Sequence, residues 1–316
     1  MEYRKLISFG KSSFVVSLPK PWVVKQNLKK GDLIYFDDRG VDLVLHPREN
    51  TSKDEVKEVT IEIDGKDMRR IQREIISHYI KNYKNIILIG RELKDKAQEI
   101  ESAIQNLIAL EIMEQTSNRI MARDFLNMED ISLINLIRKM DIITRAMLED
   151  ALKTFEEDCY DNLMHRDKDI NRLCFLVFRV VRYGLENTSF MYKKYNLNSI
   201  DLLNIWRLAA HIEAIADETK RLSRYMLKVK LDKKSKDKVT NLLKKIKESY
   251  LETMKGYYTK NIELVHEILQ QKDTLVKECD KVYAENASVA WFGYLTNDLK
   301  ALMTYVHDIA RIVYQD

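Results

Sequence analysis

Proline is missing from most of this 316-residue sequence, because Pro19, Pro21 and Pro47 are its only prolines and all lie near the start. Glycine is scarce as well, and beyond residue 124 only Gly184, Gly256 and Gly293 occur. Proline and glycine both interrupt helices. Their scarcity predicts that the chain is helical from about Asp124 to its end.

Cysteine and long apolar runs are limited too. Cys159, Cys174 and Cys279 are odd in number and widely spaced, which fits neither a disulfide framework nor a zinc motif and favours a reducing compartment. The longest apolar run, 173–178, is far shorter than the roughly 20 residues that span a bilayer. The first residues do not resemble a signal peptide. We therefore expect a cytoplasmic protein without stable membrane insertion.

Recognisable catalytic and phosphate-binding motifs are also lacking. No glycine-rich phosphate loop opens a predicted helix, and the six histidines form no H-x-x-x-H pair and accompany no nucleophile. We therefore expect a protein that is not an enzyme. The net charge of +4 is too small to establish a nucleic-acid partner by itself. With 32% charged and 45% hydrophobic residues, the composition is typical of a helix-rich protein, and 316 residues are enough for two or three domains.

The first 47 residues differ from the rest of the chain in hydrophobic periodicity and in proline content. Alternating apolar residues predict strands at 3–9, 14–18, 33–36 and 41–45, with turns at 10–13 and 37–40. Prolines 19 and 21 end the second strand and begin a short helix that we expect to end near residue 28. Two hairpins around one helical turn are too small to bury a core alone. This segment therefore predicts an obligate homodimer in which two copies share one apolar interior.

The residues SFVVSLPKPWVVKQNLKKGDLIYF, from Ser13 to Phe36, resemble the AbrB/SpoVT swapped-hairpin domain. The resemblance implies a dimeric β-barrel that binds DNA over residues 1–50. It also implies that basic side chains of the loops and first strand contact DNA, namely Arg4, Lys5, Lys11, Lys20 and Lys25. Residues 1–50 contain nine Lys and Arg against six Asp and Glu, and such side chains bind phosphates without reading bases. Alternatively, these lysines only solvate a dimer.

A polar linker, 48–55, precedes a segment with mixed periodicity. Strands are predicted at 59–63, 85–89 and 119–122, and helices at 67–83 and 94–114. Residues 56–123 therefore predict a small βαβαβ module.

The helical remainder falls into two sets of about three long helices. Helical spacing is strong at 131–152, 174–191, 202–227, 239–258, 262–269 and 282–314. Breaks are predicted at 196–201, with Ser199 as a helix N-cap, and at 231–237. The segments near 148–155 and 251–258 echo one another, which indicates degenerate repeats. We expect one three-helix bundle at 124–230 and another at 231–316.

Three stretches of the first set, MLEDALKTFEED, RDKDINRLCFLVFRVVR and WRLAAHIEAIADETKRL, resemble the PhoU phosphate-uptake regulators. The resemblance covers roughly residues 124–316 and implies two tandem three-helix bundles. Together with the N-terminal resemblance, it indicates a mainly α, multidomain chain of the archaeal AbrB–PhoU layout. Proteins of that family act in phosphate homeostasis beside a phosphate transporter, and many bind metal clusters through repeated E/D-x-x-x-D motifs.

Glu213 and Asp217 form the best candidate metal site, because carboxylates four residues apart share one helix face and repel each other unless a cation lies between them. A divalent or iron-type metal would supply that cation. The resemblance adds Asp167 and Asp169 as further ligands. Alternatively, Arg221 supplies the counter-charge on a solvated face.

In the second set, Lys300 and Thr304 occupy the positions equivalent to Glu213 and Asp217 and cannot hold a metal. Only Glu278 and Asp280 remain there from the partner acidic segment. We therefore expect at most one metal site.

A run of lysines and arginines lies between residues 220 and 247. It indicates either contact with DNA, an acidic partner or a membrane surface, or an ordinary solvated interhelical loop.

These patterns lead to a functional hypothesis with one rival. The hypothesis is a transcriptional regulator of phosphate uptake that dimerises and binds promoter DNA through residues 1–47. Its bundles would sense a metal, phosphate or a transporter component. The rival is a signalling adaptor bound to the ATPase of the phosphate transporter, in which the N-terminal barrel only dimerises.

Overall fold

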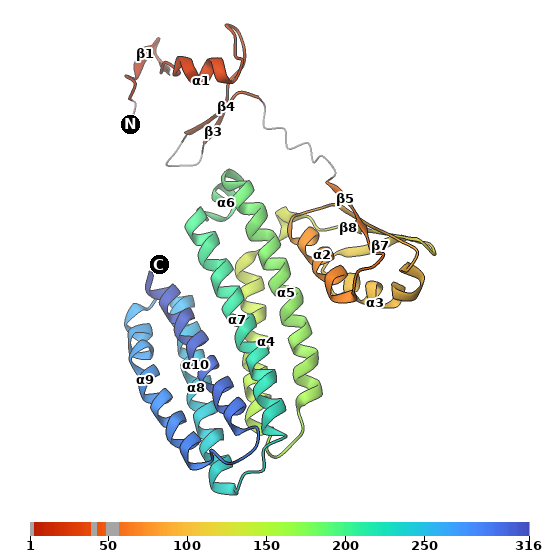
Figure 1. Cartoon of the computed structure of the whole chain (residues 1–316). Coiled ribbons are helices and arrows are strands. Elements are labelled where there is room, and N and C mark those ends of the chain that lie inside the picture. Colours follow the sequence, from red (N-terminus) through yellow and green to blue (C-terminus); the bar gives the residue numbers. More distant parts are fainter. Residues whose placement is uncertain (1–2, 39–42, 49–56, 316) are drawn as a thin grey trace. The chain divides into compact units, whose positions relative to one another are not determined.

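A computed structural model describes residues 3–38, 43–48 and 57–315 (Figure 1). Its contacts divide the chain into two compact units. The first contains residues 1–55 together with 188–196, and the second contains 56–187 together with 197–316.

The first unit contains two short hairpins and two short helices. Strands β1 (Ile7–Phe9) and β2 (Ser13–Val15) pair antiparallel, as do β3 (Tyr35–Asp38) and β4 (Leu43–His46). Helix α1 (Lys20–Lys25) follows Pro19 and has Pro21 in its first turn, as the sequence predicts. Helix α6 (Thr188–Tyr195) belongs to the same unit. The described strands form two separate two-stranded sheets and no closed barrel.

Some predictions for the first unit lie partly outside the described residues. The turn expected at 37–40 extends into residues 39–42, and the linker expected at 48–55 lies almost wholly within 49–56. The swapped barrel shared by two chains stays a prediction.

The second unit begins with a four-stranded sheet. Its elements are β5 (Glu58–Glu62), α2 (Met68–Ile80), β6 (Asn85–Ile89), α3 (Leu93–Gln105), β7 (Leu110–Gln115) and β8 (Arg119–Asp124). The strand order is β5-β6-β8-β7, with β5 parallel to β6 and the other pairs antiparallel. Helices α2 and α3 cover one face (Figure 1), where Ile75, Leu88, Ile104 and Ile120 are fully buried.

The prediction of one helix over 94–114 is wrong. Helix α3 ends at Gln105, Ala109 turns the chain with a positive φ of 62°, and β7 follows. Apolar residues continue at helical spacing through this turn, but Ile112 pairs with Ala122 in the sheet. Strand pairing therefore overrides the local period, and the module has four strands and extends to Asp124.

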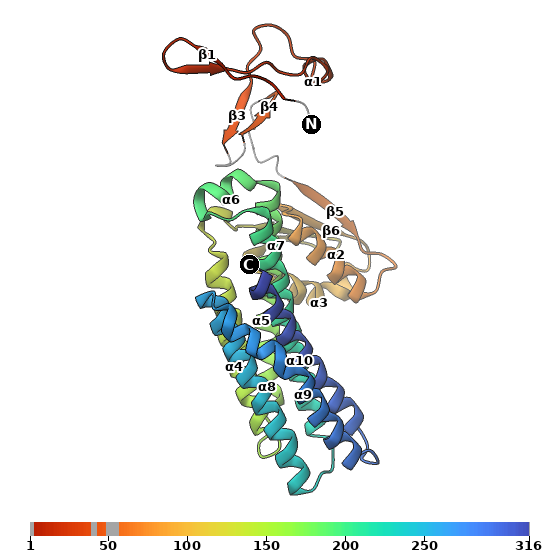
Figure 2. The same cartoon turned by 90° about the vertical axis from the view of Figure 1, so that its left-hand side faces the viewer.

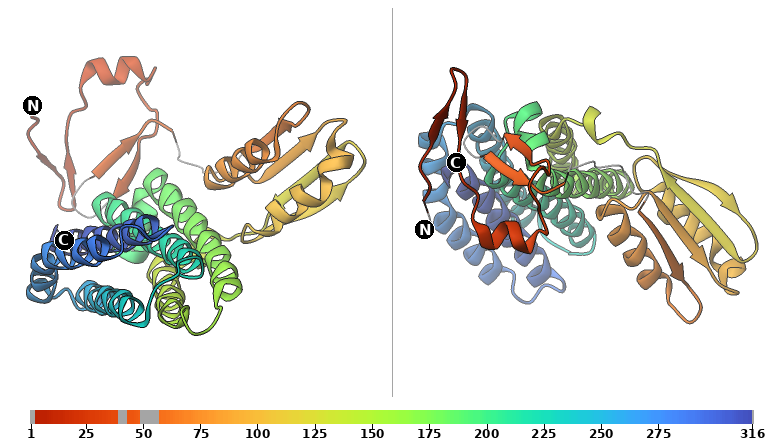
Figure 3. Two further views of the ribbon diagram at one scale, coloured as in Figure 1. Left: turned by 60° about the horizontal axis from the view of Figure 1, so that its bottom comes forward. Right: turned by 90° about the horizontal axis from the view of Figure 1, so that it is seen from above.

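Six long helices make up the rest of the second unit. One set consists of α4 (Leu133–Lys153), α5 (Tyr160–Glu186) and α7 (Ser199–Met226), preceded by a short 3-10 turn at Met128–Asp130. The other consists of α8 (Lys233–Thr259), α9 (Ile262–Glu285) and α10 (Phe292–Gln315). The helices of each set contact one another, and α7 and α4 contact α10 and α8 across the sets (Figures 2 and 3).

Polar caps fix where these helices begin. The N-cap of α7 is Asn198 rather than the predicted Ser199, because its side chain accepts hydrogen bonds from the backbone while Asp201 completes a capping box. Asp232 caps α8 inside the predicted break at 231–237.

Several helices are longer than predicted or begin at another residue. Helix α5 begins at Tyr160 rather than 174, and α9 runs to Glu285 rather than 269. The helix predicted to begin at 282 begins at Phe292, after a turn in which Trp291 has a positive φ of 70°.

Candidate DNA-binding segment and acidic cluster

The apolar side chains of the N-terminal segment are exposed. Tyr3, Phe9 and Leu33 are 87%, 71% and 70% exposed, and Phe14, Val24 and Phe36 are exposed to a similar degree. No described side chain between residues 3 and 48 is buried. The two hairpins therefore present their strand residues without a core, as expected of a unit this small.

The five basic residues expected to contact DNA lie on the same segment. Arg4, Lys5, Lys11, Lys20 and Lys25 are all exposed. Lys11 lies in the turn between β1 and β2, and Lys20 and Lys25 begin and end α1. Their charges are thus distributed over the loops and the helix.

The acidic residues predicted to hold a metal are only partly brought together. Asp167 of α5 and Asp217 of α7 meet at the ammonium group of Lys220, whose Nζ lies 2.7 Å and 2.8 Å from their carboxylate oxygens. Arg221 lies 2.5 Å from the other oxygen of Asp217. Asp169 is directed elsewhere, because its exposed side chain is paired with Arg172 at 3.9 Å.

Glu213 completes the acidic cluster one turn before Asp217. Burial raises the pKa of Glu213, and the neighbouring carboxylates of Asp217 and Asp167 raise it further. Burial opposes the charge of Lys220, but hydrogen bonds to Asp167 and Asp217 outweigh it and raise the pKa of this lysine. The cluster is therefore a link between α5 and α7 held by one partly buried ammonium.

This arrangement does not fit a metal ion. An ammonium group lies between the two carboxylates that would coordinate the metal, and Asn171 donates to Asp167 at 3.4 Å. Across the described parts of the chain, no group of three or more His, Cys, Asp or Glu side chains could hold a metal. A metal here stays a prediction from the spacing of Glu213 and Asp217 and from the resemblance. The alternative in which Arg221 supplies a counter-charge matches the contacts, although Lys220 was not foreseen.

The equivalent region of the second helical set is also ion-paired. Lys300 pairs with Asp280 at 2.5 Å, and the Thr304 hydroxyl donates to the backbone of Lys300. Glu278 accepts from Lys245 at 2.6 Å. The basic run at 220–247 is also partly ion-paired: Lys238 pairs with Glu285 of α9, and Lys247 pairs with Glu149 of α4.

Arg179 of α5 forms a buried site that sequence reasoning missed. Its guanidinium makes two parallel hydrogen bonds to Asp124, at 2.9 Å and 2.7 Å, and a third to Asn82 at 2.9 Å. It also lies 4.5 Å from the ring centroid of Tyr79. The signal available in the sequence was an arginine inside the apolar stretch between Leu173 and Val181. The site joins the α/β module to the helical bundle.

Comparisons with known proteins place the chain in no family: no family model, curated protein or solved structure matches it. Among the residues that the structure describes, no helix is long and apolar enough to cross a membrane.

Proposed function

We propose that this protein is a homodimeric DNA-binding regulator of phosphate uptake. The N-terminal hairpins of two chains would form one barrel that binds promoter DNA, and the helical bundles would sense phosphate status. The residues that resemble AbrB/SpoVT and PhoU proteins supply the two halves of this proposal.

The observation that carries the proposal is the exposure of apolar side chains in the N-terminal unit. Exposed aromatic and aliphatic residues at this density, such as Tyr3, Phe9, Phe14 and Leu33, are typical of an interaction surface. A second copy offers the same residues, so each chain would supply half of a shared core. Folding of this unit and association would then be one process.

Basic residues support DNA as the ligand of the paired unit. Arg4, Lys5, Lys11, Lys20 and Lys25 are exposed in each chain, and a dimer doubles their number on one small barrel. Lysine and arginine bound to phosphates release counterions, which makes affinity fall steeply with salt.

Fluorescence anisotropy on duplex DNA from upstream of phosphate-transport genes tests the proposal. We expect binding at low salt, with a log–log salt slope that becomes shallower by about 1 for each phosphate contact removed. Changing Lys11, Lys20 and Lys25 to glutamine should therefore abolish measurable binding at moderate salt. Changing Lys277, an exposed lysine of α9, to glutamine is the matched control and should leave binding unaltered.

Wild-type affinity that is unmeasurable at low salt, or that ignores salt, would contradict the proposal. The same triple variant distinguishes the DNA-binding regulator from the alternative, a signalling adaptor of the phosphate transporter. If phosphate-dependent output in cells survives in a variant that no longer binds DNA, the barrel serves only for dimerisation.

A further inference from the structure

Two interhelical ion pairs mark the contact between α8 and α9. Lys238 pairs with Glu285, and Lys245 with Glu278 at 2.6 Å. Within each helix the paired residues are seven positions apart, so the pairs repeat once per heptad. The next step of this repeat places Glu252 opposite Gln271. We call this row of ion pairs the ladder. At its next step α8 has glutamate in place of lysine and α9 has glutamine in place of glutamate, so no ion pair can form between the helices.

The contact between the two helices is hollow where the ladder stops. Glu252 and Gln271 line this groove together with Glu248 and Glu267, and Lys245 with its partner Glu278 lies at one end. Ile268 and Leu275 form an apolar floor, being only 6% and 8% exposed. At the other end, near Leu264, the helices meet closely: a Cβ added to Gly256 would lie 2.4 Å from Val265. The groove is thus bounded on both sides.

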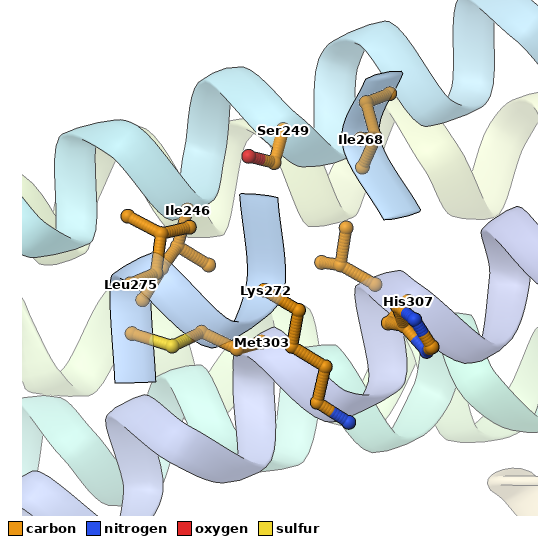
Figure 4. Close-up of a pocket in the computed structure, with 8 residues that line it drawn as sticks. Ile246, Ser249, Ile268, Lys272, Leu275, Met303 and His307 are labelled. Atoms are coloured by element: carbon orange, nitrogen blue, oxygen red, sulfur yellow. The ribbon is translucent and has the colours of Figure 1, made fainter. Parts of the chain in front are cut away.

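A small apolar pit lies beneath the groove and shares Ser249, Ile268 and Leu275 with it (Figure 4). Met303 and His307 of α10 line the far side of the pit. The Nδ1 atom of His307 is buried and has no hydrogen-bond partner in the described part of the chain. The pit has room for about one water molecule, so an apolar side chain lying in the groove would pack on Ile268 and Leu275 above it.

The groove carries more negative than positive charge, because not all of its glutamates are paired with a lysine. Lys245 neutralises Glu278, and Lys255 lies 3.5 Å from Glu252 on the exposed surface. Glu248 and Glu267 have no cationic partner within 4 Å among the residues described by the structure. Uncompensated carboxylates above an apolar floor favour a cationic, amphipathic occupant.

We propose that the groove between α8 and α9 binds a basic amphipathic helix of a partner protein. Lysines or arginines of that helix meet Glu248, Glu252 and Glu267, and an apolar residue packs on the groove floor formed by Ile268 and Leu275. The groove extends along α9 from Leu264 to Glu278, roughly 21 Å at about 1.5 Å per residue, which accommodates about four helical turns. Binding would add a fourth helix to the set formed by α8, α9 and α10.

The test uses a fluorescein-labelled, 18-residue helical peptide of lysine and leucine, and a second peptide with glutamate in place of lysine. The decisive variant of the full chain is Glu252→Lys with Gln271→Glu, which completes the ladder and should close the groove without loss of stability. We expect wild type to bind the lysine peptide with salt-dependent affinity, and the double variant to bind at least about tenfold more weakly. Glu99→Lys, on the exposed surface of α3, is the matched control and should bind like wild type.

Equal binding of the lysine peptide by wild type and the double variant would overturn the proposal. Equal binding of the two peptides by wild type would overturn it too. A lower molecular mass of the double variant without peptide, in sedimentation equilibrium, would assign the groove to a second copy of this chain and likewise overturn it. The inference does not depend on DNA binding, and none of these measurements contains DNA.

Discussion

The carboxyl group of Asp298 is buried where α10 meets α7, beside that of Glu218. The two residues are 6% and 8% exposed, and the Oδ2 atom of Asp298 has no hydrogen-bond partner in the described chain. Burial and, after it, the Glu218 carboxylate together raise the pKa of Asp298 to about 7, although Arg221 and Arg224 oppose the shift. Asp298 therefore keeps its proton in the folded protein at pH values where an unfolded chain loses it.

This difference makes stability depend on pH. Below about pH 4 Asp298 is protonated in both the folded and the unfolded protein, so its buried carboxyl group does not lower the free energy of unfolding. Between about pH 4 and pH 7 only the unfolded chain loses this proton readily, so the free energy of unfolding falls progressively as the pH rises to about 7. Asp298→Asn, which stays neutral, should be more stable than wild type by about 4 kcal/mol at pH 8, because the pKa is raised from 3.8 to about 7, and by almost nothing below pH 4. Urea unfolding at several pH values measures the difference, with Asp273→Asn on the exposed side of α9 as control. A constant difference across this range would contradict the assignment.

The sequence revealed the acidic cluster only in part. Glu213 and Asp217 were identified because residues four apart share a helix face, which is a local property. Lys220 was missed as a partner because its contact with Asp167 joins two residues that lie 53 positions apart in the chain, on different helices. The groove between α8 and α9 was missed for the same reason, since the heptad ladder becomes visible only when both helices are aligned.

At the scale of elements, Arg179 connects α5 to the sheet module. It is 1% exposed, and its carboxylate partner Asp124, at the end of β8, is 3% exposed. Asn82, which holds a third hydrogen bond, ends the turn between α2 and β6 with a positive φ of 62°. Three separate elements thus converge on one buried guanidinium.

Removing only one side of this buried pair should be costly. Arg179→Met leaves the buried Asp124 carboxylate with only the half-exposed Lys84 ammonium, 3.4 Å away, as a cationic partner among the described residues. We therefore expect a loss of about 3 kcal/mol in the free energy of unfolding, the lower end of the range for a broken buried ion pair. Arg179→Met combined with Asp124→Asn removes both charges and should recover at least half of that loss. Chemical denaturation measures both variants. A single variant within about 0.5 kcal/mol of wild type would show that the pair does not join these elements.

The elements were predicted with uneven success. Long helices such as α4 and α7 were confirmed because their apolar period continues over many turns. Strand β7 was missed because Ile112 continues the spacing of the preceding helix, and only its pairing with β8 makes it a strand. The turn at 286–291 was missed because no proline or glycine occurs in it.

For the whole molecule, the two units have different packing. The second unit buries many apolar residues, both in the sheet module and in the two helical sets. Within the described parts of residues 3–48, no side chain is buried. A chain with one well-packed unit and one without a core is what the proposed dimer requires, since the second copy then completes the smaller unit.

Sedimentation equilibrium of the full chain at micromolar concentration tests the central claim most directly. The proposed shared barrel predicts a dimer of twice 37.4 kDa, and Phe14→Glu with Leu33→Glu should shift the protein to monomer, because both apolar side chains would enter the shared core. Tyr314→Glu, an exposed aromatic residue of α10, should leave the dimer intact. A wild-type mass of 37.4 kDa, with the N-terminal unit folded, would contradict the account.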